Sequence, residues 1–313
     1  MQQLAQSLLV QGFPALQEPM PRGDMPGDAI FYSVEAFNKA QDLYRQLIDH
    51  LPTQATSKFV LSIAGGSGSG KTTLASILAY YFQAAGIGTY ILSGDNYPHR
   101  IPQYNDGERL QTYRDAGQAA LVAADRYDDQ VKQVLEDLYA QFQDGSQLES
   151  SDYPWYQTYH QAGKRALANY LGTEKELNFP AINRVLTAFK EGQETIWLKR
   201  MGRTPDDLWY DPVNFKDIQL LIVEWTHGNH ADLGPVDCRL FLNSTPQETL
   251  AYRQLRARDG QADSAFVTMV LEIEQAKLHQ QAKGADLIFS KQGEVLSYQD
   301  YLSLTKGEDF YDL

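Results

Sequence analysis

The stretch Gly65-Gly66-Ser67-Gly68-Ser69-Gly70-Lys71-Thr72 is the most informative segment of this chain, because it matches the pattern G-x-x-x-x-G-K-[ST] in full. The apolar run 59–64 precedes it, and a segment with apolar residues at helical spacing follows over 70–85. A buried strand, a glycine-rich loop and a helix in this order predict a phosphate-binding loop. A chance match would lack both flanking elements.

Each part of this loop has a chemical purpose. Its glycines let successive backbone N–H groups turn into one concavity and bind phosphate oxygens, and the following helix turns its positive end on the same anion. Lys71 places a charge near the β- and γ-phosphates, and the Thr72 hydroxyl is a ligand for Mg²⁺. We therefore predict that the loop binds a nucleotide together with Mg²⁺. The expected nucleotide contacts are Gly65, Gly66, Ser67, Gly68, Ser69, Gly70, Lys71, Thr72 and Thr73.

Apolar runs that alternate with helical patterns on either side of the loop predict an α/β fold with a mainly parallel, five-stranded sheet flanked by helices. The expected strands cover 59–64, 89–93, 218–223, 239–242 and 286–289. The first two, with the helix between them, form a βαβ unit.

The rest of the chain divides around this core. Residues 1–56 are predicted to form an N-terminal extension with one helix, capped by Ser33, after an irregular stretch over 1–30 that is rich in proline and glycine. Residues 57–313 form the main domain, interrupted by a mainly helical insert at about 106–177. Residues 195–215 predict an antiparallel ribbon.

Composition narrows the class of partner. Among 313 residues, 27 are Lys or Arg and 40 are Asp or Glu, so the net charge is −13. An acidic surface repels nucleic acid and anionic lipid, and no run approaches the roughly 18 apolar residues of a membrane span. The first ten residues carry no basic group before their apolar stretch, so no secretory signal is predicted. One cysteine, Cys238, excludes an intramolecular disulfide framework, and a cytoplasmic location is expected.

Absent motifs indicate which kind of nucleotide-binding protein this is. A GTPase needs N-K-x-D downstream, yet the one Asn-Lys pair, Asn38-Lys39, lies before the loop. The run that starts at Leu92-Ser93-Gly94 departs from the L-S-G-G-Q signature of ABC-type ATPases. A small-molecule kinase remains, with its acceptor beside the nucleotide at the carboxyl ends of the strands.

Acidic residues follow two of the predicted strands. Asp95 lies just beyond the strand 89–93, where a carboxylate can orient an acceptor hydroxyl and take its proton. The alternative is an aspartate that serves only its turn. Glu224 ends the strand at 220–224 in a Walker-B-like arrangement, and is expected to act on Mg²⁺ or a bound water, or to assist Asp95. The alternative for Glu224 is a strand-end cap.

Basic residues suggest two further roles. Arg253, Arg256 and Arg258, on or after a helix that starts at Thr245, are predicted to close over the nucleotide, with Arg253 stabilising the transferred phosphoryl group. The alternative is a solvated face paired with Glu248 or Asp259. The expected acceptor contacts are Tyr97, Arg100, Arg200, Arg203, Trp225 and His227. Their alternatives are a solvated ribbon tip, a core tryptophan and a structural histidine.

Taken together, these motifs resemble the uridine kinase/phosphoribulokinase superfamily, and are similar to pantothenate, fructose- and glycerate-type kinases. The resemblance rests on 65–73 (GGSGSGKTT), Asp95 with Tyr97, Glu224, the arginines of 253–258 and the run 284–288, in the family's order. It implies a P-loop kinase fold, an ATP–Mg²⁺ donor and phosphorylation of a small metabolite's hydroxyl. The residues after Glu224, Trp225-Thr226-His227, replace the family's usual glycine, and the insert is long.

Three functions remain open at this stage. The first is a kinase for a nucleoside, sugar, sugar phosphate or hydroxy acid. The second is a nucleotide-binding regulator or scaffold without phosphotransfer, and the third is a P-loop ATPase. The dependence of ADP production on an added acceptor distinguishes them. The N-terminal helix could mediate a homodimer, although nothing in the sequence requires one.

Overall fold

A computed structural model describes residues 1–25, 30, 32–146, 152–202, 204, 207–244 and 264–306. The described residues fall into two compact units. The first contains 1–97, 178–244 and 278–306, and the second contains 98–177 and 264–277.

The first unit is built on a six-stranded sheet with the strand order β2-β5-β1-β6-β7-β8. Its five parallel strands are β1 (Phe59–Gly65), β2 (Thr89–Ser93), β5 (Leu220–Glu224), β6 (Cys238–Leu242) and β7 (Leu287–Phe289). The predicted α/β fold and its five strands are thus confirmed. The sixth strand, β8 (Val295–Leu296), pairs antiparallel with β7, and two residues are too few to give a sequence signal.

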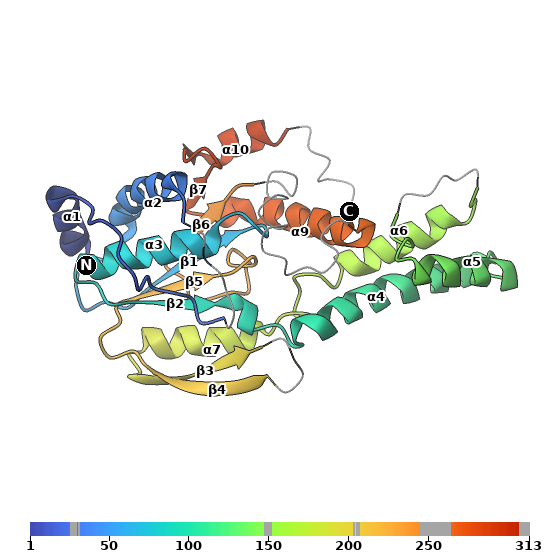
Figure 1. Ribbon diagram of the computed structural model, residues 1–313, viewed down its shortest axis with the longest axis horizontal. Helices are drawn as coiled ribbons and strands as arrows, with labels where there is room; N and C mark the ends of the chain where they lie inside the picture. Colours follow the sequence, from blue (N-terminus) through green and yellow to red (C-terminus); the bar gives the residue numbers. More distant parts are fainter. Residues whose placement is uncertain are drawn as a thin grey trace. The chain divides into compact units, whose positions relative to one another are not determined.

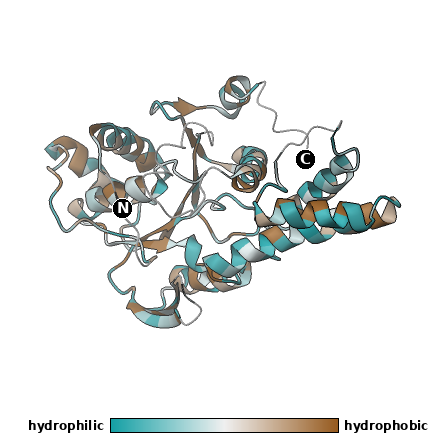
Figure 2. Ribbon diagram, turned by 45° about the vertical axis from the view of Figure 1, so that its right-hand side comes forward, coloured by the Kyte–Doolittle hydropathy of each residue, from teal (hydrophilic) through white to brown (hydrophobic). Residues whose placement is uncertain are grey.

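The central strands are apolar because both faces of the sheet are covered. All seven residues of β1 are buried, and the sheet strands are hydrophobic along their length in Figure 2. Leu61 and Ile63 pack with α3 (Lys71–Ala84), whereas Ala64 packs with Phe241 on the opposite face. The helix α7 (Phe179–Lys190) lies on the side of the sheet away from α3 (Figure 1).

The N-terminal extension holds two helices, so the prediction of one was wrong. The expected helix is α2 (Val34–Leu47), whose cap Ser33 accepts a hydrogen bond from the Ala36 N–H at 3.2 Å, and η1 (Ile48–His50) continues it. The missed helix, α1 (Gln2–Gln11), precedes the proline-rich stretch and buries Ala5 and Leu8. Two buried residues form too short a pattern to outweigh the nearby prolines and glycines.

Two further elements complete the first unit. The predicted ribbon is present as an antiparallel pair, β3 (Thr195–Met201) and β4 (Leu208–Asn214). After β8 comes the short helix α10 (Tyr298–Leu304), and η3 (Ala282–Gly284) precedes β7. None of the helices described in either unit is long and apolar enough to cross a membrane.

The second unit is helical, as expected for the insert. It contains α4 (Pro102–Ala123), α5 (Asp129–Ala140), α6 (Tyr156–Ala168) and the first part of α9 (Ala265–Gln281). Glycines bring α4 and α6 together: a Cβ on Gly117 would lie 2.5 Å from the Tyr159 ring, and one on Gly163 would lie 2.6 Å from the Tyr113 ring. The aromatic residues of the insert therefore form packing for a helical core.

Candidate active site

The phosphate-binding loop joins β1 to α3 as predicted. Gly65 lies where a Cβ would meet the Leu242 carbonyl oxygen and the Ser69 Oγ, each at 2.8 Å. Gly70, at the helix start, has a φ of 91°, in the left-handed region that favours glycine. The Lys71 Nζ donates to the Gly65 carbonyl at 2.9 Å and to the Gly66 carbonyl at 3.1 Å. The loop carbonyls thus hold the Lys71 charge at the N-terminus of α3.

Two oxygen-bearing side chains meet beside this loop. The Thr72 Oγ1 donates to the Glu224 Oε1 at 3.1 Å, and both side chains are buried. Glu224 ends β5, which pairs with β1 on one side and with β2 on the other, so it faces Ile63 and Ser93 in the register. A hydroxyl and a carboxylate are the hard oxygen ligands that suit Mg²⁺.

Asp95 completes this edge of the sheet. It lies in the turn η2 (Gly94–Asn96), directly after β2, and it is exposed while Gly94 and Asn96 are buried. Since β1, β5 and β2 are neighbours and parallel, their carboxyl ends meet at one edge. The structure therefore brings the P-loop, Glu224 and Asp95 to the same edge.

Trp225 is packed against the turn that carries Asp95. Its side chain is 2 % exposed, its ring centroid lies 5.5 Å from that of Phe179, and it lies equally far from the His227 ring. A Cβ on Gly94 would lie only 2.0 Å from the Trp225 Cγ. The bulky Trp225 side chain after Glu224 therefore fits only because the residue before Asp95 is a glycine. Acceptor contacts by Trp225 and His227 remain predictions.

Replacing Gly94 with alanine is expected to lower the free energy of unfolding by about 2 kcal/mol, because the added methyl overlaps the Trp225 ring. Urea denaturation would measure the change. Gly107→Ala is the matched control, since a Cβ there meets nothing within 4 Å. Equal stability of the Gly94→Ala variant and the wild type would contradict the close contact.

A buried polar network that sequence reasoning missed surrounds the end of β2. The Asp24 Oδ1 accepts from the Ser93 N–H at 2.7 Å and from the Asn96 Nδ2 at 3.1 Å. The Asp24 Oδ2 accepts from the Tyr90 hydroxyl at 3.1 Å and pairs with the Arg200 Nη1 at 2.8 Å. Burial raises the pKa of Asp24 to about 6, against the opposing effects of Arg200 and these donors. Asp24 lies in the stretch expected to be irregular, where nothing in the sequence singles it out.

The structure also places Arg200, one of the predicted acceptor contacts. Its side chain is buried, and its Nη2 donates to the Tyr90 hydroxyl at 3.0 Å while its Nε lies 3.4 Å from the Asp211 carboxylate. The guanidinium is thus held by Asp24, Tyr90 and Asp211. Its contact with an acceptor remains a prediction.

A hollow of about 140 Å³ lies between α7 and the β3–β4 ribbon. The residues that line it combine aromatic rings, two cations and an apolar floor: Tyr97, Ala181, Arg184, Val185, Ile196, Trp197, Lys199 and Tyr210. The Tyr97 side chain is 1 % exposed, and its hydroxyl has no hydrogen-bond partner among the described residues. Burial lowers the pKa of Lys199 to about 8.

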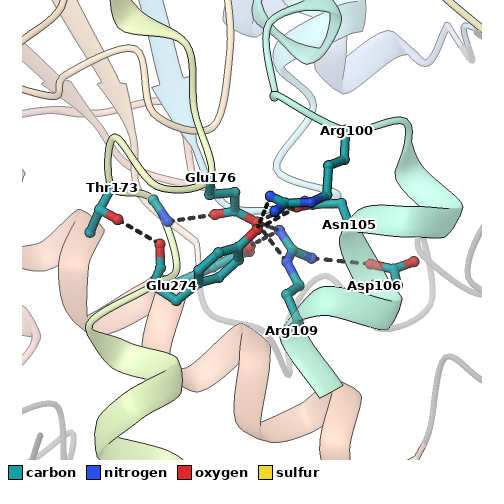
Figure 3. Close-up of polar contacts among 9 residues, drawn as sticks. Arg100, Asn105, Asp106, Arg109, Thr173, Glu176 and Glu274 are labelled. Carbon is teal, nitrogen blue, oxygen red and sulfur yellow. Dashed lines mark hydrogen bonds and ion pairs between the residues drawn. The ribbon is translucent and has the colours of Figure 1, made fainter. Parts of the chain in front are cut away.

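The second unit contains Arg100, another predicted acceptor contact. Its Nη1 donates to the Tyr170 hydroxyl at 3.1 Å, and its Nη2 lies 3.5 Å from Glu108. Figure 3 shows Arg100 beside a buried carboxylate, Glu176, to which the Arg109 Nη2 is paired at 2.7 Å. This network ties α4 to the segment before α7. An acceptor role for Arg100 stays a prediction.

Several predicted residues lie outside the described part of the chain. They are Arg203 of the ribbon and the three arginines Arg253, Arg256 and Arg258, together with the expected helix start at 245–248. Their roles toward the nucleotide and the acceptor remain predictions.

Comparison with known proteins finds a matching family and relatives whose names include kinases. A family described as Zeta toxin matches residues 41–176. The bifunctional alpha-galactosidase/sucrose kinase AgaSK of Mediterraneibacter gnavus is 38% identical over 277 residues, which are 88% of this chain and 25% of that protein. The adenylyl-sulfate kinase of Yersinia pestis is 39% identical over 69 residues, which are 21% of this chain and 32% of that protein.

This chain therefore spans about a quarter of the length of the first relative and about a third of the second. Among solved structures, D-glycerate 3-kinase from Cryptococcus neoformans var. grubii aligns with a TM-score of 0.44 and 11% identity, over 85% of this chain and 99% of that one. The relatives in sequence are kinases of small molecules, and they confirm the expected resemblance to P-loop small-molecule kinases.

Proposed function

We propose that this chain is an ATP- and Mg²⁺-dependent kinase that phosphorylates a hydroxyl group of a small metabolite, with a sugar as the favoured acceptor class. The observation that carries the proposal is the meeting of the P-loop, the Thr72–Glu224 pair and Asp95 at one edge of the sheet. The name of the relative that matches 88% of the chain, which includes sucrose kinase, supports a sugar acceptor.

The residues at this edge supply what phosphoryl transfer needs. Asp95 orients the acceptor hydroxyl and takes its proton, while the hydroxyl oxygen bonds to the γ-phosphorus and the bond to the β–γ bridging oxygen breaks to release ADP. Lys71 stabilises the charge on the phosphates. Thr72 and Glu224 would hold Mg²⁺, which neutralises phosphate charge when bound. Catalysis is then mostly positioning and electrostatic stabilisation.

The hollow beside the ribbon is our candidate for acceptor binding. Tyr97, which follows Asp95 by two residues, is one of the residues that line it, so the hollow begins next to the predicted base. Trp197 and Tyr210 offer aromatic faces, and Lys199 offers a charged donor. Aromatic surface with a few placed polar groups suits a polyhydroxylated ligand.

ADP release tests the function directly. Purified protein would be given ATP and Mg²⁺ with sucrose, other sugars, sugar phosphates, nucleosides or hydroxy acids, and Lys71→Ala would be the blank. We expect release that depends on one acceptor class and vanishes in the blank. Equal release in every pool would indicate an ATPase. ATP binding without release in any pool would overturn the kinase proposal in favour of a regulator.

The hollow predicts a pH dependence of acceptor binding. The amine of Lys199 is protonated below its pKa of about 8 and neutral above it, so the KM for the acceptor should rise as the pH increases through 8. In Lys199→Met we expect a KM raised about tenfold at pH 7, the scale of one hydrogen bond to a charged group, with no further rise. Initial rates between pH 6.5 and 9.5 would measure this.

Lys190→Met is the control for the loss of a lysine, because Lys190 pairs with Asp237 outside the hollow. An acceptor KM for Lys199→Met that equals the wild-type value across this range would remove Lys199 from the acceptor site.

A further inference from the structure

We infer that Asp24, a residue of the N-terminal extension, is a positioning residue for phosphoryl transfer. The inference rests on the proposed function. Within the described part of the chain, the Asp24 carboxylate bonds to Tyr90, Ser93, Asn96 and Arg200, none of which belongs to the P-loop or lines the hollow. It holds the two pieces of backbone from which the base and the acceptor-binding side chains project.

The first piece is the turn that carries Asp95. One oxygen of Asp24 accepts hydrogen bonds from Ser93 and Asn96, which lie two residues before Asp95 and one residue after it. A single carboxylate oxygen of Asp24 therefore holds the residues on both sides of Asp95. Asn96 also connects this turn to β3, because its Oδ1 accepts a hydrogen bond from the Met201 N–H at 2.9 Å.

The second piece is the ribbon. The other oxygen of Asp24 pairs with Arg200, and Arg200 lies next to Lys199 on β3. Adjacent residues of a strand point to opposite faces, so the Arg200 and Lys199 side chains leave β3 on opposite faces, and Lys199 lies with Tyr210, its register partner, among the residues that line the hollow. One carboxylate thus joins the general base to the acceptor side.

The ion pair between Asp24 and Arg200 is buried. The Asp24 and Arg200 side chains are 6% and 9% exposed, so the carboxylate and the guanidinium are largely withdrawn from water and depend on each other. Removal of the Asp24 charge would leave the Arg200 guanidinium buried with only the half-exposed Asp211 carboxylate nearby. The ribbon and the turn could then shift relative to each other, and small misplacements of reacting groups are costly in rate.

The test replaces Asp24 with asparagine, which keeps the shape and removes the charge. We expect kcat to fall about tenfold or more and the acceptor KM to rise, while the dissociation constant of ATP stays within about twofold of the wild type. A purely structural role would lower the melting temperature without this split between acceptor and nucleotide parameters.

Asp237→Asn is the matched control. The Asp237 carboxylate also accepts a backbone hydrogen bond, from Val60 at 2.8 Å, and pairs with a cation, Lys190, at 2.7 Å. Asp237 directly precedes β6 and lies beside Val60, near the beginning of β1 and thus at the end of that strand away from the P-loop. We expect this variant to lose stability with a kcat within about twofold of the wild type.

The outcomes separate the inference from the function on which it rests. A wild-type protein without acceptor-dependent ADP release would overturn the proposed kinase. An active wild type with an equal kcat in Asp24→Asn would overturn the positioning role alone. If Asp24→Asn does not fold, Tyr90→Phe decides, because it removes only a hydroxyl that bonds to Asp24 and Arg200. An unchanged kcat and acceptor KM in that variant would then overturn the inference.

Discussion

Replacement of Asp95 by asparagine is expected to lower kcat for acceptor phosphorylation by about 10²-fold or more, because the amide cannot take the proton of the hydroxyl. Asp95 is exposed in its turn and the amide is of equal size, so folding should be unaffected. The affinity for ATP should also stay unchanged, since the phosphates are expected to bind to the P-loop on the neighbouring elements. Single-turnover rates and nucleotide titration would measure the two properties separately.

Asp49→Asn is the control for this substitution. Asp49 is likewise an exposed aspartate inside a short 3₁₀ turn, η1, but it lies in the N-terminal extension. We expect it to retain full activity. Near-normal turnover in Asp95→Asn would remove Asp95 as the base and shift that role toward Glu224, the other acid at this edge.

The second large effect is expected for Lys71→Met. The methionine keeps most of the length of the side chain but removes the charge that two loop carbonyls hold at the expected phosphate site. Loss of one electrostatic contact to the transferred group costs about 10²- to 10³-fold in kcat, and the affinity for ATP should fall as well. Steady-state kinetics and equilibrium binding of ATP would measure both losses.

Stability distinguishes this effect from unfolding. Lys71 is buried and its two hydrogen bonds to loop carbonyls are lost in the methionine variant, so the free energy of unfolding should fall by about 1–3 kcal/mol while the variant stays folded. Lys190→Met again provides the control for removing a lysine. A Lys71→Met variant that binds ATP and transfers phosphate normally would mean that the loop is not the nucleotide site.

The sequence revealed those parts of the fold that depend on neighbouring residues. The P-loop is a local motif, and the five parallel strands are continuous apolar runs, so each could be recognised within one segment. The helix α1 and the strand β8 were missed because each presents too few apolar positions to form a period.

In the candidate site, too, some residues could be predicted from the sequence and others could not. Residues at strand ends, such as Asp95 and Glu224, could be placed because parallel strands end at one edge. Asp24 could not, because its partners are distant in sequence: Ser93 lies 69 residues away and Arg200 lies 176 residues away. Only the folded chain shows that Arg200 pairs with an aspartate of the N-terminal segment.

The interlocked glycines and tyrosines of α4 and α6 have a mechanical consequence. Gly117 receives the Tyr159 ring and Gly163 receives the Tyr113 ring, so the two helices engage each other in both directions. Sliding along the common axis would drive both rings out of their sockets at once. The pair should therefore resist sliding and move as one rigid unit about 30 Å long, the length of α4 at 1.5 Å per residue.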